Sequence, residues 1–193
     1  MPEFSTNWMR ELGAWRRHLK PFVGRAARAL EIGSFEGRSA IWLLENVLTH
    51  PASTITCVDP FQSDRASYRR FLANTQPLRQ PASTKCLHIR KTSREFFCSY
   101  FDEAWSIVYV DGSHVAFDVL LDLLQSWERL KPGGILIVDD LVWDGYNGTG
   151  RHADGPRRAW GAFLSVLAPD SFTILHERAV GFVRKKQATV VGI

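Results

Sequence analysis

The sequence predicts an α/β fold with a Rossmann-like, doubly wound sheet that is mostly parallel. Three observations predict it. Short apolar runs alternate with helical patterns, no internal repeat or linker-like stretch divides the 193 residues, and 45% of them are hydrophobic, enough for one sizeable core. We therefore expect one domain over residues 1–193, in which residues 1–26 form an N-terminal helical cap segment.

Helical and strand patterns take turns through the first half of the chain. In the first crossover helix, Ile41, Leu44 and Leu48 form one apolar stripe. We expect helices at 6–19, 37–49 and 63–74, strands at 27–32, 54–58 and 86–90, and a further helix after the third strand.

The second half begins with the most apolar strand pattern, at residues 106–110, which is typical of a central strand buried on both faces. The next helix ends before the Lys-Pro-Gly-Gly string at 131–134, because proline and glycine do not continue a helix. Its apolar residues, spaced by three and four, are Phe117, Leu120, Leu121, Leu124 and Trp127.

A strand at 135–138, a polar loop at 141–154 and a helix begun by Pro156 complete the alternation. Two last apolar runs, at 172–175 and 180–183, are too close together for a helical crossover, so they should pair antiparallel. The result is a seven-stranded sheet with a C-terminal antiparallel hairpin.

An acidic loop with two glycines, EIGSFEG at residues 31–37, joins the first strand to its helix. Gly33 and Gly37 allow a sharp turn and a close approach of a ligand to the backbone. The third glycine of the dinucleotide-binding motif is absent, and Glu31 places a negative charge where a pyrophosphate would lie. The loop thus favours a cationic ligand over a dinucleotide, and the alternative is a plain strand-to-helix turn.

Acidic side chains follow three further strands. Asp59 follows the second strand, Asp111 the fourth, and Asp139 and Asp140 the fifth. Ligands of open α/β sheets bind at these carboxyl ends, and Asp59 lies at the usual distance from the glycine loop for a residue that binds ribose hydroxyls. The alternatives are that Asp59 caps the turn before Pro60, and that Asp111 and Asp139 only bond loop amides or a cofactor's amino group.

The strings EIGSFEGRSA, KTSREF and VDDLVWDG resemble motifs of the class I S-adenosylmethionine-dependent methyltransferases, over about residues 28–185. Within that class the chain is similar to the metal-dependent O-methyltransferases typified by catechol O-methyltransferase. The string DGSH, followed by a helix and LKPGG, also resembles a broad group of small bacterial methyltransferases.

The resemblance implies S-adenosylmethionine as the cofactor. Ser39 would bond its methionine carboxylate, Asp59 its ribose, and Ser93 would lie beside its adenine. The cofactor-binding residues expected in full are Glu31, Gly33, Ser34, Gly37, Ser39, Asp59, Ser93 and Asp111.

The resemblance also implies a magnesium ion at Asp111, Asp139 and Asp140, since oxygen ligands suit Mg²⁺. Asp140 stands where the family usually has asparagine, which adds charge to the site. His114 stands at the position of the family's catalytic lysine, and a neutral imidazole can accept a proton there. We expect O-methylation of a small hydroxylated molecule, with His114 and Asp111 as the catalytic residues.

Three alternatives stay open or are disfavoured. A metal-independent O- or N-methyltransferase and a non-catalytic cofactor-binding module remain alternatives. A nucleic-acid substrate is disfavoured, because the net charge of +4 comes from mostly scattered basic residues and the fifth strand leads into VDDL rather than a base-methylation motif.

The aromatic residues Trp143 and Tyr146, with His152, belong to the polar loop at 141–154. This loop forms either a lid over the substrate or an ordinary packing contact.

The remaining expectations concern location and assembly. Cys57, Cys86 and Cys98 form no C-x-x-C pair and are expected to be reduced thiols. The chain lacks an apolar leader in its first ten residues and any run of the ~18 apolar residues that span a bilayer, so we expect a cytoplasmic protein without membrane contact. Trp8 and Trp15 either cover the active site or contact a partner subunit in a homodimer.

Overall fold

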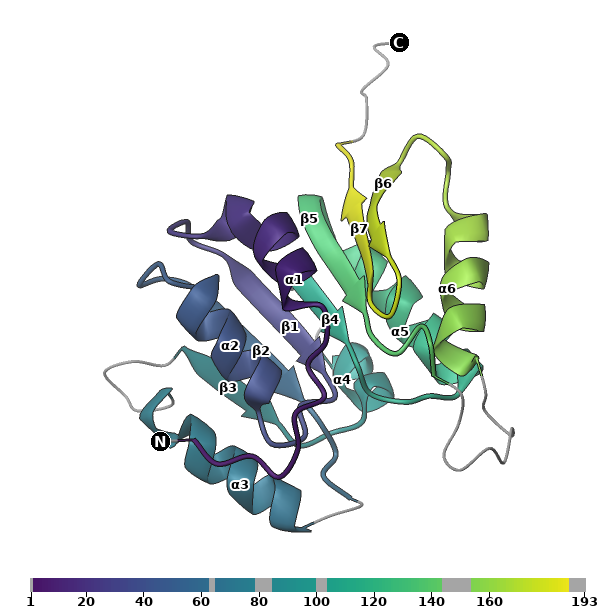
Figure 1. The fold of residues 1–193 in the computed structure, drawn as a ribbon. Coiled ribbons are helices and arrows are strands. Elements are labelled where there is room, and N and C mark those ends of the chain that lie inside the picture. Colours follow the sequence, from purple (N-terminus) through teal and green to yellow (C-terminus); the bar gives the residue numbers. More distant parts are fainter. Residues whose placement is uncertain (1, 63–64, 79–84, 100–103, 144–153, 188–193) are drawn as a thin grey trace.

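The computed structural model describes residues 2–62, 65–78, 85–99, 104–143 and 154–187. Within these ranges, seven strands form one sheet in the order β3-β2-β1-β4-β5-β7-β6 (Figure 1). The strands are β1 (Arg28–Ile32), β2 (Thr54–Val58), β3 (Cys86–Ile89), β4 (Trp105–Val110), β5 (Leu130–Val138), β6 (Phe172–Glu177) and β7 (Gly181–Lys185).

The sheet is mostly parallel. Strands β1 to β5 pair in parallel with their neighbours, whereas β7 is antiparallel to both β5 and β6. Six strands therefore run in one direction and β7 runs against them, which confirms the predicted sheet and its C-terminal hairpin. The strand order reverses between β1 and β4, the point at which open α/β sheets bind their ligands.

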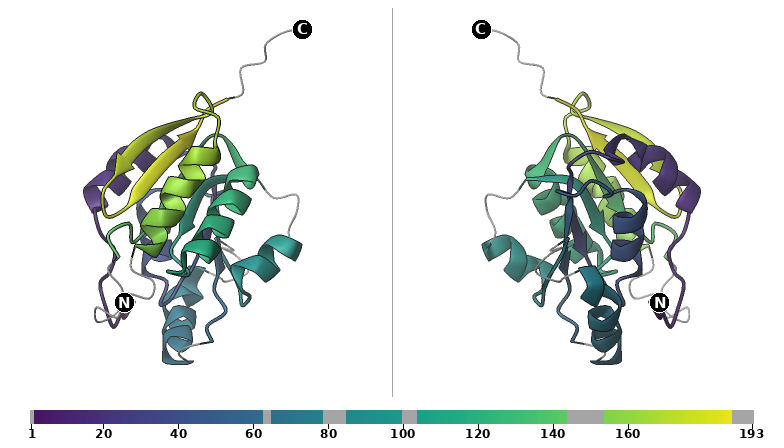
Figure 2. Two further views of the ribbon diagram at one scale, coloured as in Figure 1. Left: turned by 90° about the vertical axis from the view of Figure 1, so that its right-hand side faces the viewer. Right: turned by 90° about the vertical axis from the view of Figure 1, so that its left-hand side faces the viewer.

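Two layers of helices cover the sheet (Figure 2). The helices are α1 (Leu12–Leu19), α2 (Arg38–Asn46), α3 (Arg65–Thr75), α4 (Ser93–Ser99), α5 (Ala116–Arg129) and α6 (Gly155–Val166). One core cluster contains Trp15, Leu43 and Phe71 from α1 to α3, and the other contains Phe96, Leu123 and Phe163 from α4 to α6. Because both faces are covered, the central strands are buried on both sides.

The expected helix at 6–19 is correct only from Leu12 onward. Residues 2–11 form neither a helix nor a strand, and several of their polar groups bond to α2, its loop and α3. The Ser5 amide donates to Glu36 Oε2 (2.6 Å), and the Glu3 amide donates to Asn74 Oδ1 (2.8 Å). We call residues 2–11 the N-terminal strap.

The apolar stripe expected on α5 is only partly buried. Leu120 and Trp127 pack against the core, whereas Phe117 is 65% exposed and Leu124 is 36% exposed. The most buried positions of the helix are Val119, Asp122, Leu123 and Ser126. The prediction was wrong for Phe117 and Leu124, because a search for apolar spacing passes over a buried face that contains polar residues.

Strand β5 begins earlier than the predicted residue 135. It starts at Leu130 opposite Trp105, and Ile135 pairs with Ile107, so the Lys-Pro-Gly-Gly string lies within a register shift. In the described part of the chain, no helix is both long and apolar enough to cross a membrane.

Candidate functional site

The carboxyl ends of five neighbouring strands, β3, β2, β1, β4 and β5, are held together by four main-chain hydrogen bonds. In each, the amide of the residue after one strand donates to the last carbonyl of the next strand. The pairs are Asp59 to Ile89 (3.2 Å), Gly33 to Val58 (2.9 Å), Asp111 to Ile32 (2.8 Å) and Asp139 to Val110 (3.0 Å). The predicted site positions therefore meet along one edge of the sheet.

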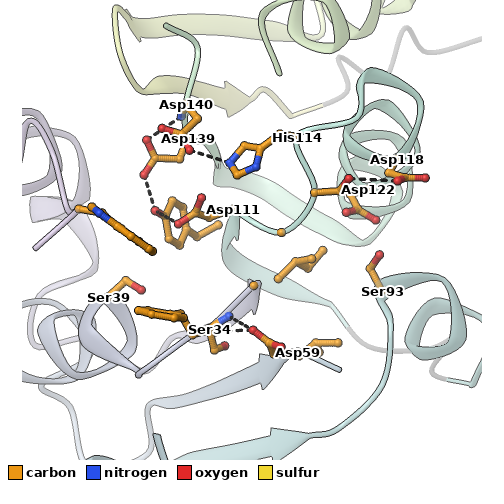
Figure 3. A pocket seen from close by; sticks show the side chains of 18 of the residues that line it. Ser34, Ser39, Asp59, Ser93, Asp111, His114, Asp118, Asp122, Asp139 and Asp140 are labelled. Carbon is orange, nitrogen blue, oxygen red and sulfur yellow. Dashed lines mark hydrogen bonds and ion pairs between the residues drawn. The ribbon is translucent and has the colours of Figure 1, made fainter. Parts of the chain in front are cut away.

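A cavity of about 980 Å³ opens over this edge, at the upper end of the usual size for a ligand pocket (Figure 3). Nine of the predicted site residues line it, namely Gly33, Ser34, Ser39, Asp59, Ser93, Asp111, His114, Asp139 and Asp140. The other two, Glu31 and Gly37, lie outside the lining. The cavity also receives four residues of the N-terminal strap, Thr6, Trp8, Met9 and Arg10.

The two loop glycines are required by the protein's own packing. Gly33 has φ +83°, and a Cβ there would lie 2.1 Å from the Asp111 carbonyl oxygen. Gly37 has φ +82°, and its Cβ would lie 3.1 Å from the Phe71 ring and 3.2 Å from Thr75. The sharp turn is as expected, but the space at each missing Cβ is bordered by protein atoms.

The Asp59 carboxylate holds the glycine loop in place. Its Oδ2 accepts hydrogen bonds from the amides of Ser34 and Phe35, both at 3.0 Å, and its Oδ1 accepts one from the Phe61 amide at 2.7 Å. The turn-capping role considered as an alternative is therefore present. Asp59 also lines the cavity, so the ribose role stays a prediction beside it.

Glu31 is fully buried behind Ser39, whose hydroxyl donates to Glu31 Oε1 at 2.5 Å. Burial raises the pKa of Glu31 to about 7. While Glu31 is ionised, the Ser39 proton is engaged and cannot also bond a ligand carboxylate. When Glu31 is protonated it can donate to Ser39, which leaves the Ser39 proton free for the role that was expected.

Tyr109 connects two of the acids, and the sequence analysis did not identify it as a site residue. Its hydroxyl lies 2.5 Å from Asp139 Oδ2 and 2.9 Å from Asp111 Oδ2. Burial raises the pKa of Asp139 to about 6, and burial together with the charges of Asp139 and Asp140 raises that of Asp111 well above its ordinary value. The period of two along a strand places residues 109 and 111 on one face, and this signal was available in the sequence.

His114 is fixed on two sides. Its Nε2 lies 2.8 Å from Asp140 Oδ2, and its ring stacks on Trp143 with centroids 4.0 Å apart and planes 7° apart. A Cβ on Gly155 would lie 1.9 Å from the His114 carbonyl oxygen, so only glycine fits where α6 begins. Tyr146 and His152 lie outside the described residues.

Three side chains can offer ligand atoms to one cation. Atoms of Asp111, His114 and Asp140 all lie within 4.8 Å of one another. Asp139, the third ligand predicted, is not in this group, because its two oxygens accept from Tyr109 and from the Asp140 amide (2.7 Å). In the candidate set of metal ligands, His114 therefore stands in place of the predicted Asp139.

The two tryptophans of the N-terminal region have different surroundings. Trp8 is 54% exposed, stacks on Phe35 with centroids 5.0 Å apart, and lines the cavity. Trp15 is fully buried and meets Tyr109 edge to face, with centroids 4.8 Å apart. Of the two roles considered, covering the site fits Trp8, and a homodimer stays a prediction.

The ionisable side chains of the cavity lining are predominantly acidic. Among the described residues, three arginines line it, Arg10, Arg38 and Arg94. Seven acids of the described ranges line it, Glu36, Asp59, Asp111, Asp118, Asp122, Asp139 and Asp140. Such a lining attracts cations and repels anions.

Solved structures with the same fold include several methyltransferases. A provisional rRNA methylase from Clostridium thermocellum has a TM-score of 0.71 at 14% identity, covering 94% of this chain and 99% of its own. An O-methyltransferase from Bacillus cereus, solved with S-adenosylhomocysteine, has a TM-score of 0.68 at 16% identity, with coverages of 94% and 84%. These likenesses show the fold.

A third structure is MycE, a methyltransferase of mycinamycin biosynthesis solved with magnesium and S-adenosylhomocysteine. Its TM-score is 0.65 at 19% identity, covering 94% of this chain and 51% of its own. No curated protein sequence matches the chain significantly.

The sequence profile of a methyltransferase-domain family matches residues 30–141, more than half of the chain. The matched segment runs from within β1 to the end of β5 and includes the strand ends that border the cavity. The chain therefore belongs to this methyltransferase-domain family, and it has the class I methyltransferase fold.

Proposed function

We propose that the protein is an S-adenosylmethionine-dependent O-methyltransferase that acts on a small hydroxylated molecule, with His114 as the general base. One observation carries the proposal: a single cavity contains both the glycine loop with Asp59 and the His114–Asp140 pair. The likeness to an O-methyltransferase solved with S-adenosylhomocysteine supports it.

The lining of the cavity fits this cofactor. S-Adenosylmethionine, when bound, supplies a methyl group on a positively charged sulfur, and it also contains an ammonium group. Seven acids against three arginines make the cavity favourable for such charges. The volume of about 980 Å³ leaves room for a second small molecule.

His114 is positioned to accept a proton. When its Nε2–H donates to Asp140 Oδ2, the other ring nitrogen, Nδ1, is the free acceptor. The Trp143 stack restricts the ring plane, which favours one orientation toward the acceptor hydroxyl. Asp140 stabilises the imidazolium that forms when His114 takes the hydroxyl proton.

The donor set of Asp111, His114 and Asp140 also fits a divalent cation, and Mg²⁺ is the one found in MycE. A cation bound there would lower the pKa of the acceptor hydroxyl. A metal-independent reaction has its own support, because the His114–Asp140 hydrogen bond is complete without an ion. In a ligand role Nε2 carries no proton, so the two roles of this nitrogen exclude each other.

We also propose that the acceptor is not a nucleic acid and that the protein works in the cytoplasm without membrane contact. The acidic lining supports the first part, because a polyanion is repelled from such a cavity. The structural likeness to the provisional rRNA methylase concerns the fold alone.

The test is methyl transfer to a panel of hydroxylated small molecules with wild type, His114→Ala and, as a control away from the cavity, His50→Ala. His114→Ala should bind S-adenosylhomocysteine normally and lose about 10²- to 10⁴-fold in kcat. Full activity of His114→Ala would contradict the base assignment. Activity that EDTA abolishes and Mg²⁺ restores would select the metal-assisted reaction, and indifference to EDTA the metal-independent one.

A further inference from the structure

Asp122 is a buried carboxyl group for which the proposed reaction has no use. It lies in the second turn of α5, is 3% exposed, and shares its helix face with the buried Val119 and Leu123. A carboxylate in such a place costs free energy unless it is hydrogen-bonded. Burial raises the pKa of Asp122 to about 7, which reflects that cost.

Ser93 is the neighbouring hydroxyl that lowers the pKa of this carboxyl group, against the larger effect of burial, and the nearby charges among the described residues are Asp118 and Arg94. An ionised carboxylate has two oxygens and about four acceptor positions. Because Asp122 lines the cavity, the remaining positions are available to a ligand there.

Ser93 itself is held in a defined position. It is the first residue of α4, directly after Thr92. The Thr92 amide donates to Glu95 Oε2 at 2.8 Å, and the Glu95 amide donates to Thr92 Oγ1 at 3.3 Å, so the two residues form a capping box. The start of the helix is therefore held in a defined position, which places Ser93 near the Asp122 carboxyl group.

The polar residues follow one another across the cavity from one side to the other. Figure 3 shows Ser39 on one side, Asp59 between, and Ser93 with Asp122 on the opposite side. If the cofactor's amino-acid end lies toward Ser39 and its ribose near Asp59, its base lies beside Ser93 and Asp122. This step rests on the proposed function.

We infer that Asp122 accepts a hydrogen bond from the exocyclic amino group of the cofactor's adenine, with Ser93 holding the carboxylate. Adenine offers one amino group on its outer edge, and a carboxylate is an acceptor only. A 6-oxo base has a carbonyl oxygen at that position, and two acceptors repel each other. Asp122 is thus a specificity-determining residue for adenine.

The rival residue is Asp118, one turn earlier on α5. Its Oδ2 already accepts from the Ser113 hydroxyl at 3.0 Å, and its side chain is only half-buried. It also lines the cavity. Asp118→Asn therefore provides the matched control.

The experiment is calorimetric titration at pH 8.5, above the pKa of Asp122, of wild type, Asp122→Asn and Asp118→Asn with S-adenosylhomocysteine and with S-inosylhomocysteine, which has the 6-oxo base. Wild type should prefer the adenosyl ligand by at least tenfold. Asp122→Asn should reduce this ratio by tenfold or more, because its amide can donate to the 6-oxo group, and Asp118→Asn should keep the wild-type ratio.

An unchanged ratio in a folded Asp122→Asn, or a change in Asp118→Asn instead, would overturn the inference. If Asp122→Asn does not fold, the wild-type ratio decides, and equal affinity for the two ligands overturns the inference. Wild type that binds neither ligand would overturn the proposed function as well, so the two failures are distinguishable.

Discussion

The hydroxyl of Tyr109 joins the ends of two strands by donating to the Asp139 carboxylate at 2.5 Å. The same hydroxyl lies 2.9 Å from Asp111, yet it has only one proton to share. Two buried acids therefore depend on one donor, and the cost of removing that donor depends on how the acids are charged.

Tyr109→Phe should lower the free energy of unfolding by about 1–3 kcal/mol at pH 8, because it leaves buried carboxylates without their donor. The pKa of Asp139 is raised to about 6, so at pH 5 the acid carries its own proton and the loss should be smaller. Urea unfolding at the two pH values measures this. Tyr68→Phe, which removes a hydroxyl 3.3 Å from His88, is the control, and equal losses at both pH values would contradict the prediction.

Glu31 should make the ligand-free protein less stable as the pH rises from about 4.5 to about 7. Its pKa is raised to about 7 by burial, so in this window the unfolded chain loses a proton that the folded chain keeps. Below this window both states hold the proton and the penalty disappears. Glu31→Gln should remove up to about 3 kcal/mol of this loss in the free energy of unfolding. Unfolding measured between pH 4.5 and pH 8 tests this, and a pH dependence identical to that of wild type would refute the assignment.

Gly33→Ala should prevent folding or cost more than about 3 kcal/mol, because its Cβ would overlap the Asp111 carbonyl oxygen and its φ is +83°. Gly13→Ala is the matched control. It lies in α1 with no atom within 4 Å of the added Cβ, so it should be neutral or stabilise by about 0.5–1 kcal/mol. Thermal melting of both variants is the measurement, and a Gly33→Ala variant as stable as wild type would show that the strand ends are less closely packed.

Glu36→Ala should release the N-terminal strap from the cavity. Glu36 accepts from the Ser5 amide, the Ser5 hydroxyl (2.7 Å) and Arg70 (2.8 Å). Cleavage by trypsin after the exposed Arg10 should become several-fold faster, while the melting temperature changes little. Arg70→Ala removes one of the three contacts and should have a smaller effect, and an unchanged cleavage rate in Glu36→Ala would contradict the role of this anchor.

The strands, the C-terminal antiparallel hairpin and the sheet edge that borders the cavity could be predicted, because apolar runs and glycine turns determine secondary structure from nearby residues alone. Strand β2 was placed at its observed bounds, and His114 and the acids were expected near one another. The buried face of α5 and the start of α1 could not be predicted, since they depend on Asp122 and on Ser5 finding distant partners. Tyr109 was missed because its ring fits an apolar strand equally well, and only the fold shows which groups surround its hydroxyl.

The edge-to-face contact of Trp15 with Tyr109 has a consequence for how far this domain can be shortened. Trp15 precedes the family-matched segment, which starts at residue 30. A fragment restricted to that segment would lose the Trp15 ring that packs against Tyr109. Tyr109, and with it Asp111 and Asp139, would then become accessible to solvent from that side. The matched segment thus takes part of its interior packing from residues that lie before it in the chain.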